Sequence, residues 1–406
     1  MTVSPVIRSC ENTRDPHHRQ TPKLLVDYLP PYMKIVADPN IPFVQKAFGP
    51  LGEVRLVPGR EITAGAARDA DVLLVRSVTP VNAALLDGSQ VKFVATATIG
   101  IDHVDQEHLL RRGIGFASAQ GSNANSVAEY IVAAILEIAH RQKFRLRDKT
   151  IGVIGVGNVG SRVVRYVEAL GLRVLQNDPP RQRAEKLPHF VSWERVLAEA
   201  DIITLHVPLT RAGPDATFHL FDKDKLALLE QRRPVVINTA RGAVVDNKAL
   251  LKAVDGERLG GVVLDVWESE PNILPELLDV VDLGTPHIAG YSFDGKVNGT
   301  RMIYRAVCKF FGITPSWEPT LPPATVPRVE ITASSGEDDG EVLRRVVRRV
   351  YDITKDDAAL RKSVRMFDEL RAEYPVRREF FNTELVLRGA RGILCATFAA
   401  LGFKTV

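Results

Sequence analysis

Three polar residues in the second half of the chain have the types and the order that oxidation of a hydroxy acid requires. Arg241, Glu270 and His287 each follow an apolar run that predicts a β-strand. An arginine fork can hold a carboxylate through two parallel hydrogen bonds, and a histidine paired with a carboxylate can accept a hydroxyl proton. Taken singly, each residue is equally well explained as a surface, loop or structural side chain. Because all three follow strands of one predicted sheet, together they predict a catalytic set.

A glycine-rich segment earlier in the chain predicts a binding site for a dinucleotide. It directly follows the apolar strand predicted over 150–154 and opens the helix predicted over 159–170. Glycines in this context allow a tight turn, close approach of a pyrophosphate and close packing of helix on strand. The next strand ends at Asp178, whose carboxylate would bind the adenosine ribose and repel a 2′-phosphate, so NAD is favoured over NADP. The cofactor-binding residues predicted in this unit are Gly155, Gly157, Asn158, Val159, Gly160 and Asp178.

The elements that must position these residues alternate between strand and helix. A first series has strands predicted over 33–38, 71–76 and 91–96. A long helix follows over 126–141, with one apolar stripe at helical spacing. A second series has six strands, predicted over 150–155, 173–177, 201–206, 234–238, 260–265 and 282–285. This rhythm predicts an α/β protein with doubly wound parallel sheets covered by helices.

Composition and charge exclude several classes of protein. The 406 residues are 45% hydrophobic and 25% charged, and 53 basic against 49 acidic residues give a net charge of only +4. These values exclude disordered, collagen-like and membrane-spanning classes, and no nucleic-acid or membrane partner is expected. Three scattered cysteines and the lack of a metal-ligand pattern predict neither disulfides nor a metal site. They favour a reducing, cytoplasmic location.

The two ends of the chain differ from the alternating middle. Residues 1–32 are polar and contain several prolines but no apolar signal segment, so we expect a disordered extension. Residues 321–406 follow a proline-rich linker, and a helix predicted over 341–351 has valines on one face. Its other face carries Arg344, Arg345, Arg348 and Arg349. These arginines could form a phosphate or nucleic-acid patch, but a solvated or interface face is favoured, because acidic residues nearly balance basic ones in this part.

Three segments around the catalytic set, 238–246, 264–271 and 285–290, resemble the signature of the D-isomer-specific 2-hydroxyacid dehydrogenases. Residues 75–79, 93–105 and 287–291, together with the long tail, narrow the resemblance to one branch of that family. That branch oxidises 4-phospho-D-erythronate with NAD in pyridoxal 5′-phosphate (vitamin B6) biosynthesis. The resemblance covers 33–406, and chains of this branch usually begin at the position of Met33.

The resemblance implies a role for each matching residue. Arg241 would bind the substrate carboxylate and 2-oxygen, and His287 would accept the hydroxyl proton with Glu270 as its partner. Asp178 would hold the adenosine ribose, and Asp265 would contact the nicotinamide end of NAD. The further cofactor-binding positions implied are Val207, Thr239, Ala240, Arg241, Asp265 and Gly290. The implied substrate-contacting positions are Ser77, Thr98 and Tyr291.

A phosphorylated 2-hydroxy acid also needs positive charge or N–H donors beside its phosphate. Arg76, next to Ser77, is the first candidate for that role, and Lys296 is a weaker one. This assignment rests on the chemistry of the phosphate rather than on the resemblance.

The resemblance further implies an interrupted topology. A substrate (lid) domain over 33–125 would be completed by 287–320, and an NAD-binding domain over 126–286 would be inserted within it. The substrate would bind in the cleft between these two Rossmann-like domains. A small C-terminal α/β domain over 321–406 would form a homodimer.

Two other functions stay open from the sequence. The first is the same chemistry on another D-2-hydroxy acid such as 3-phosphoglycerate, although the tail does not resemble a small-molecule sensing domain. The second is a non-catalytic NAD(H)-sensing binding protein, because one fold can carry several functions. The complete set of Arg241, Glu270 and His287 weakens the second alternative.

Overall fold

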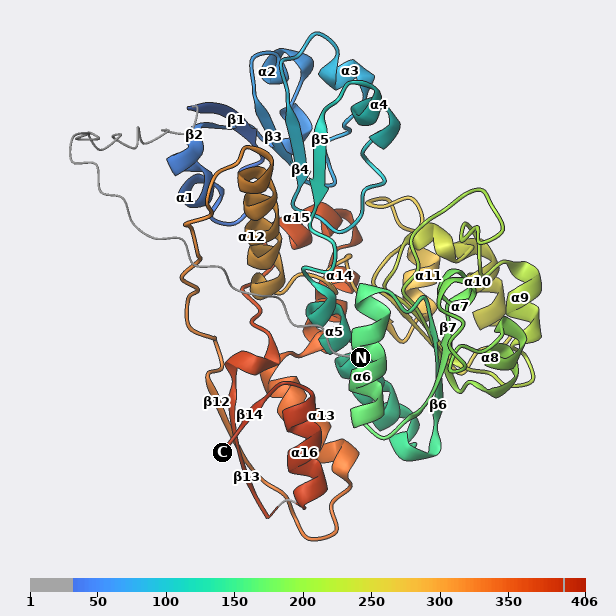
Figure 1. Ribbon diagram of the computed structural model, residues 1–406. Coiled ribbons are helices and arrows are strands. Elements are labelled where there is room, and N and C mark those ends of the chain that lie inside the picture. Colours follow the sequence, from blue (N-terminus) through green and yellow to red (C-terminus); the bar gives the residue numbers. More distant parts are fainter. Residues whose placement is uncertain (1–31, 390) are drawn as a thin grey trace, which may run out of the picture.

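The computed structural model describes residues 32–389 and 391–406, and they contain three parallel β-sheets covered by helices (Figure 1). The predicted fold class, two Rossmann-like sheets followed by a small C-terminal α/β domain, is confirmed. The extension predicted over 1–32 lies, apart from Tyr32, outside the described residues. Among the described residues, no helix is both long and apolar enough to cross a membrane.

The first sheet has five parallel strands in the order β2-β1-β3-β4-β5. Its strands are β1 (Met33–Ala37), β2 (Gly52–Leu56), β3 (Val72–Val75), β4 (Phe93–Thr96) and β5 (Gly115–Ser118). The helices between them are α1 (Val44–Phe48), α2 (Ala64–Ala67), α3 (Ala83–Leu86) and α4 (Gln106–Arg111). The residues of β3 and β4 are all buried, as expected for central strands covered on both faces.

The second sheet has six parallel strands in the order β11-β10-β9-β8-β6-β7. Its strands are β6 (Thr150–Ile154), β7 (Arg173–Asn177), β8 (Ile202–Leu205), β9 (Val235–Asn238), β10 (Gly261–Leu264) and β11 (Leu283–Gly284). Its helices are α6 (Asn158–Ala169), α7 (Pro179–Glu185), α8 (Trp193–Glu199), α9 (Lys223–Leu228), α10 (Asn247–Asp255) and α11 (Pro275–Val280). The strand order reverses at β6, so a crevice forms there at the carboxyl ends of the strands, where such sheets bind ligands.

The long helix α5 (Ala124–Gln142) connects the two sheets and is buried on nearly all sides. The predicted apolar stripe is present, but burial is not confined to it. Three helices pack against it: α6, and α13 and α14 from the C-terminal part. They cover the faces of α5 that would lie in water if the helix packed against a single sheet. Its two acids, Glu129 and Glu137, are buried as well, and the Glu137 carboxylate contacts the guanidinium of Arg344 at 3.4 Å.

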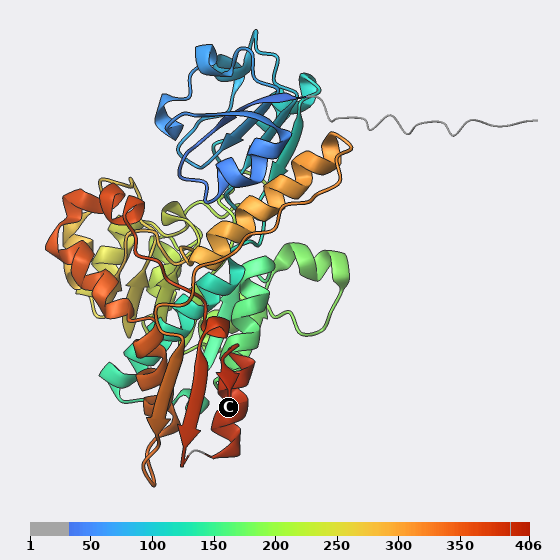
Figure 2. The same cartoon turned by 90° about the vertical axis from the view of Figure 1, so that its left-hand side faces the viewer.

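After the second sheet the chain returns to the first one through α12 (Phe293–Phe310). Ser292 begins this helix by accepting a hydrogen bond from the backbone N–H of Gly295 at 2.9 Å. The buried side chains of Ile303, Tyr304 and Val307 belong to the core of the first sheet. Figures 1 and 2 both show α12, in orange, lying against the blue strands.

The C-terminal part forms a three-stranded parallel sheet in the order β12-β13-β14. It consists of β12 (Arg328–Thr332), α13 (Asp339–Val350), α14 (Ile353–Lys362), α15 (Phe367–Ala372), β13 (Glu384–Arg388), α16 (Gly392–Ala400) and β14 (Lys404–Thr405). Three of the four arginines on α13 pair with carboxylates: Arg344 with Glu137 and Glu341, Arg345 with Glu337, and Arg348 with Asp352. These pairs favour the interpretation of this face as an ordinary charged surface over a nucleic-acid patch.

Candidate active site

The glycine-rich turn between β6 and α6 has the backbone geometry that a pyrophosphate site needs. Gly155 has φ +82°, in the left-handed region that favours glycine, and a Cβ there would lie 2.8 Å from the carbonyl oxygen of His206. A Cβ on Gly160 would lie 1.9 Å from the carbonyl oxygen of Gly155, so only glycine lets the helix approach the turn. A Cβ on Gly157 would meet no atom within 4 Å, which leaves room there for a ligand.

The start of α6 completes this cradle. Asn158 and Val159 form its first residues, where backbone N–H groups have no acceptor within the helix and the dipole is positive. Asp178, at the end of β7, accepts hydrogen bonds from the N–H groups of Val156 at 2.8 Å and Arg181 at 3.0 Å. The acid therefore lies beside the glycine turn, and these residues fit an NAD molecule.

Three further residues predicted to bind the cofactor follow β8 and β9. Val207 follows β8, and its Cγ1 would lie 2.8 Å from a Cβ on Gly155. Thr239 and Ala240 follow β9, and the Thr239 hydroxyl lies 3.4 Å from Nδ1 of His206. Burial lowers the pKa of His206 to about 3, so its imidazole is neutral at physiological pH and adds no positive charge here.

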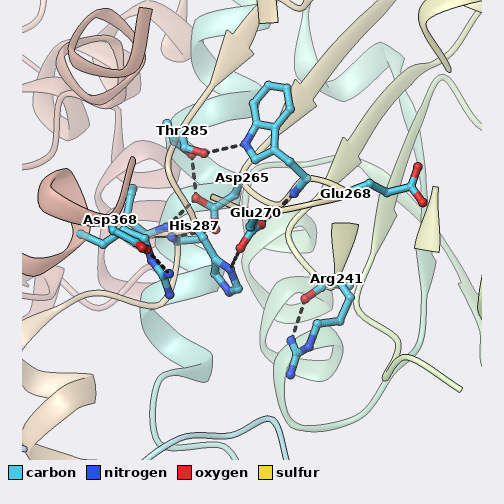
Figure 3. Close-up of polar contacts among 12 residues, drawn as sticks. Arg241, Asp265, Glu268, Glu270, Thr285, His287 and Asp368 are labelled. Atoms are coloured by element: carbon cyan, nitrogen blue, oxygen red, sulfur yellow. Dashed lines mark hydrogen bonds and ion pairs between the residues drawn. The ribbon is translucent and has the colours of Figure 1, made fainter. Parts of the chain in front are cut away.

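Asp265 fixes the loop that carries the predicted proton acceptor (Figure 3). Its carboxylate accepts hydrogen bonds from the Thr285 hydroxyl at 2.7 Å and from the N–H groups of Ile288 at 2.7 Å and Ala289 at 2.9 Å. Burial raises the pKa of Asp265, although His287 and these hydrogen bonds act in the opposite direction. The position of His287 thus depends on a carboxylate 22 residues earlier in the chain. The predicted contact of Asp265 with nicotinamide stays a prediction.

His287 and Glu270 form a hydrogen-bonded pair, with Nδ1 and Oε2 2.7 Å apart. The second oxygen of Glu270 accepts a hydrogen bond from the backbone N–H of Trp267 at 2.8 Å, which fixes the carboxylate in turn. Burial alone would raise the pKa of Glu270, but the attraction and hydrogen bond of His287, the hydrogen bond from Trp267 and the charge of Arg371 together hold that pKa below its ordinary value. Nε2 remains as the ring nitrogen for a substrate. His287 itself has φ +56°, an uncommon backbone conformation that the surrounding hydrogen bonds hold in place.

Arg241 reaches from the second sheet towards the first domain. Its Nε donates a hydrogen bond to the carboxylate of Asp102 at 3.0 Å, and its Nη1 donates to the carbonyl of Ala240 at 2.7 Å. A Cβ on Gly100 would lie 1.8 Å from Nη2 of Arg241, so glycine at this position is what permits the close approach. The contact between Arg241 and residues 100–102 joins the two Rossmann-like parts across the cleft.

These groups surround a cavity of about 450 Å³ between the two larger sheets. Of the residues singled out in the sequence, it is lined by Arg76, Ser77, Thr98, Arg241, His287, Gly290, Tyr291 and Lys296. The glycine-rich turn, Asp178, Val207, Thr239, Ala240 and Asp265 do not line it, and Glu270 contacts it only through His287. The structure therefore separates most of the predicted cofactor residues from the predicted substrate residues, and Arg241 and Gly290 are the predicted cofactor residues that line the same cavity.

Sequence reasoning missed several residues of this cavity. Asp102 and His103 lie in the segment 93–105 that carries the narrower resemblance, so their charge and polarity could have marked them. Arg371, on α15 of the C-terminal part, also lines the cavity, and no motif around it signals this. Within the described residues, no group of three or more His, Cys, Asp or Glu side chains is placed to hold a metal ion.

Comparison with known families agrees with this geometry. Residues 124–289 match the family model described as "D-isomer specific 2-hydroxyacid dehydrogenase, NAD binding domain". Residues 320–402 match a second model, a domain of unknown function termed DUF3410. The first match contains the glycine turn, Arg241, Glu270 and His287, and the second contains Arg371.

Relatives of known function match over nearly the whole chain. An erythronate-4-phosphate dehydrogenase of Salinibacter ruber is 48% identical over 362 residues, which are 86% of this chain and 92% of that protein. One of Edwardsiella ictaluri is 47% identical over 379 residues, covering 91% of this chain and 99% of the relative. Among solved structures, a D-lactate dehydrogenase of Aquifex aeolicus in complex with NAD and lactic acid is 26% identical with a TM-score of 0.54. It covers 69% of this chain and 96% of its own.

Proposed function

The chain belongs to the D-isomer-specific 2-hydroxyacid dehydrogenases, in the branch of the erythronate-4-phosphate dehydrogenases, and from this premise we propose which residues perform its reaction. The activity is NAD-dependent oxidation of 4-phospho-D-erythronate to the 2-oxo acid, (R)-3-hydroxy-2-oxo-4-phosphooxybutanoate. Arg241 binds the substrate carboxylate and 2-oxygen, and His287 accepts the hydroxyl proton. Glu270 orients the imidazole and stabilises its protonated form. The observation that carries this assignment is the 2.7 Å pair between His287 and Glu270 at the wall of the cavity that Arg241 also lines.

The order of events follows from these side chains. Two N–H groups of Arg241 hold the carboxylate and draw electron density from the 2-oxygen, which acidifies the hydroxyl. Nε2 of His287 takes the hydroxyl proton while the hydride leaves C2, and the Glu270 carboxylate stabilises the imidazolium that forms. Gly155, Gly157, Gly160 and Asp178 would hold NAD, which would supply the hydride acceptor when bound. The carbonyl that results stays within reach of the Arg241 guanidinium.

The test of this proposal is the formation of NADH from 4-phospho-D-erythronate, measured by absorbance. We expect turnover by the unaltered protein, and we expect His287→Ala to lower kcat/KM by about 10³-fold while NADH binding is retained. His287→Gln is the matched variant, since it keeps a polar side chain but cannot accept the proton. Near-normal turnover in both variants would remove His287 from the acid–base role.

The relatives also bear on the two alternatives left open by the sequence. The similarity to erythronate-4-phosphate dehydrogenases extends through the C-terminal part and does not support 3-phosphoglycerate as the substrate. A comparison of kcat/KM for the two phosphorylated acids tests this, and higher efficiency on 3-phosphoglycerate would contradict it. The hydrogen bond between His287 and Glu270, beside a cavity that Arg241 also lines, supports catalysis over a non-catalytic NAD(H) sensor.

We further propose that residues 321–406 form a homodimer in the cytoplasm. Exposed apolar side chains in this part support association: Met366, Val376, Phe381 and Ile393. Free thiols at Cys308 and Cys395 are consistent with a reducing compartment. Sedimentation of the full chain would give the mass of two chains if the proposal holds. A monomer at micromolar concentration, or recovery of the activity outside the cytoplasmic fraction, would contradict the respective part.

A further inference from the structure

The cavity between the two larger sheets is lined by more positive charge than the proposed chemistry uses. Four permanent or near-permanent cations line it: Arg76, Arg241, Lys296 and Arg371. The acidic side chain in the same lining is Asp102, which is already hydrogen-bonded to Arg241 at 3.0 Å. With Arg241 assigned to the substrate carboxylate, three cations remain without a role in the hydride transfer.

These three cations come from three separate parts of the chain. Arg76 follows β3 in the first sheet, Lys296 lies in the first turn of α12, and Arg371 lies on α15 in the C-terminal part. Figure 1 shows α15, in red, at the level where the first sheet and the second one meet. Asp368, one turn earlier on α15 and labelled in Figure 3, contacts Arg60 of the first domain at 3.2 Å. The C-terminal part is therefore seated against the cavity and the first domain at once.

Tyr291 lies between two of these cations. The Nζ atom of Lys296 is 4.2 Å from the centre of the Tyr291 ring, and the Arg371 guanidinium carbon is 5.7 Å from it. The ring of Tyr374, also from the C-terminal part, meets Tyr291 edge-on at 6.0 Å. These contacts hold the ammonium and the guanidinium around one aromatic ring, so the two charges are positioned as a pair rather than scattered on a surface.

The positive charges are poorly neutralised by the protein. Neither Arg76 nor Lys296 has a carboxylate within ion-pair distance among the described residues. Arg371 contacts Asp368 only at 3.6 Å, and its Nε is buried without a hydrogen-bond partner. Burial, followed by the charges of Arg76, Arg377 and Arg371, lowers the pKa of Lys296 to about 8. Like charges held together in this way repel one another, and a bound dianion would remove that repulsion.

We propose that Arg76, Lys296 and Arg371 form the subsite for the terminal phosphate of the substrate, and that Arg371 makes the C-terminal domain part of the active site. This inference rests on the proposed function, since it takes the substrate to be a phosphorylated hydroxy acid. A phosphate monoester carries close to two negative charges at neutral pH and three acceptor oxygens, which match two guanidinium groups and one ammonium group. Arg371 is then a specificity residue that distinguishes phosphorylated from unphosphorylated acids.

The test compares Arg371→Gln with the unaltered full-length protein. We expect KM for 4-phospho-D-erythronate to rise about 30-fold while kcat changes less than about threefold, because a charged hydrogen-bonding partner of the substrate is lost and the reacting groups are intact. Inorganic phosphate should inhibit the unaltered enzyme competitively, with its inhibition constant raised about tenfold or more in Arg371→Gln. The inhibition constant of D-erythronate, which has no phosphate, should change less than about threefold.

Two further variants control for charge and for folding. Arg365→Gln removes an exposed arginine six residues earlier that does not line the cavity, and it should change nothing. Lys296→Met removes the charge and keeps the apolar part of the side chain, so it should weaken the binding of inorganic phosphate. This variant tests the subsite independently if Arg371→Gln folds poorly. NADH affinity should be unchanged in all three variants.

The outcomes separate this inference from the proposed function. Equal weakening of inorganic phosphate and D-erythronate in Arg371→Gln and Lys296→Met would show a general structural role and overturn the phosphate subsite, as would unchanged phosphate inhibition in both. If instead the unaltered protein forms no NADH from 4-phospho-D-erythronate, the proposed function fails. Calorimetry of inorganic phosphate on the NADH-loaded protein then still tests the subsite, since it needs no turnover.

Discussion

The cofactor cradle and the substrate cavity are built in opposite ways. The cradle is formed mainly by one continuous unit, β6, α6 and β7, and its defining groups are backbone atoms exposed by Gly155, Gly157 and Gly160. The substrate cavity takes charged side chains from residues 76, 241, 296 and 371, which lie on separate elements of all three parts of the molecule. One site depends on the local path of the chain and the other on how the parts are packed together.

This difference determines how each region responds to change. In the cradle, a side chain at Gly155 or Gly160 should destabilise the fold, because its Cβ would clash with a backbone carbonyl oxygen. In the cavity, a charged side chain can be removed without a clash, and the expected consequence is weaker binding or slower turnover of the substrate. Substitutions in the two regions should therefore have different consequences.

Arg241→Ala should produce the largest effect on chemistry. Both hydrogen bonds to the carboxylate and the stabilisation of the 2-oxygen are lost, so we expect kcat/KM to fall by about 10³-fold with NADH affinity nearly unchanged. Steady-state kinetics and NADH fluorescence titration measure the two quantities. Arg241→Lys is the control that keeps the positive charge but lacks the planar guanidinium, and it should recover only part of the lost kcat/KM. Substantial recovery by lysine would show that the planar geometry is unimportant.

Two glycines of the cradle should respond differently to the same substitution. Gly157→Ala meets open space, so the fold should melt as before while affinity for NAD falls about 10- to 100-fold, because the methyl group occupies the ligand's place. Gly160→Ala would place a methyl group 1.9 Å from the carbonyl oxygen of Gly155, and the protein should lose about 3 kcal/mol of stability or more. Thermal melts and NADH titration distinguish them. Equal melting temperatures in the two variants would contradict the cradle geometry.

Glu270→Gln should have a smaller effect than loss of its partner. The amide still reaches Nδ1 of His287 but carries no charge to stabilise the imidazolium, so kcat should fall about 20-fold while KM changes little. Stopped-flow measurement of NADH formation isolates this step. A fall as large as that of His287→Ala would mean that Glu270 has a further role, and no fall at all would mean that the pair is only structural.

The pH dependence of KM should report the state of Lys296. Its pKa of about 8 lies below that of an ordinary lysine, so it is charged below that pH and neutral above it. The groups facing it are Arg76, Arg371 and Arg377, which stay charged, and the ring of Tyr291. The charge of the substrate phosphate does not change in this range, since it is already a dianion. Loss of the positive charge on Lys296 should therefore weaken substrate binding as the pH rises through 8.

We therefore expect KM for 4-phospho-D-erythronate to rise about tenfold between pH 7 and pH 9. Lys296→Arg should remove that rise, because arginine stays charged throughout. Initial rates at saturating NAD measure the profile for both proteins. A flat profile in the unaltered protein, or the same rise in Lys296→Arg, would exclude Lys296 as the titrating group. This is the smallest of the four effects and the most specific to the cavity.

The elements near the cradle were predictable because their signals are local. All six strands of the second sheet and the turn at Gly155 follow from apolar runs and glycine spacing within a few residues. The position of helix α5 was predicted, but the helices that pack against it were not. Its apolar stripe is real, but the charged and small residues outside that stripe are buried too, by helices from the C-terminal part. No pattern within residues 124–142 shows which distant elements pack against this helix.

The candidate site shows the same division. Arg241, Glu270 and His287 could be selected from the sequence, because each follows a strand and their types suit one reaction. The sequence did not predict three features: that Asp265, selected as a cofactor contact, holds the loop of His287, that Arg241 contacts Asp102, and that Arg371 lines the cavity. Each depends on a contact between residues that are far apart in the chain, or on a backbone conformation such as that of His287.

The sequence by itself determined the family, the two Rossmann-like units and the use of NAD, and it predicted the reacting side chains that we propose. These properties are encoded in short segments, where residue type and spacing constrain the backbone directly. Only the tertiary structure decided which cations share a cavity, and it placed Arg371 of the C-terminal part beside Lys296 and Tyr291. The physical reason is that charge interactions depend on distance in space, and a chain of this length can bring together any two of its elements.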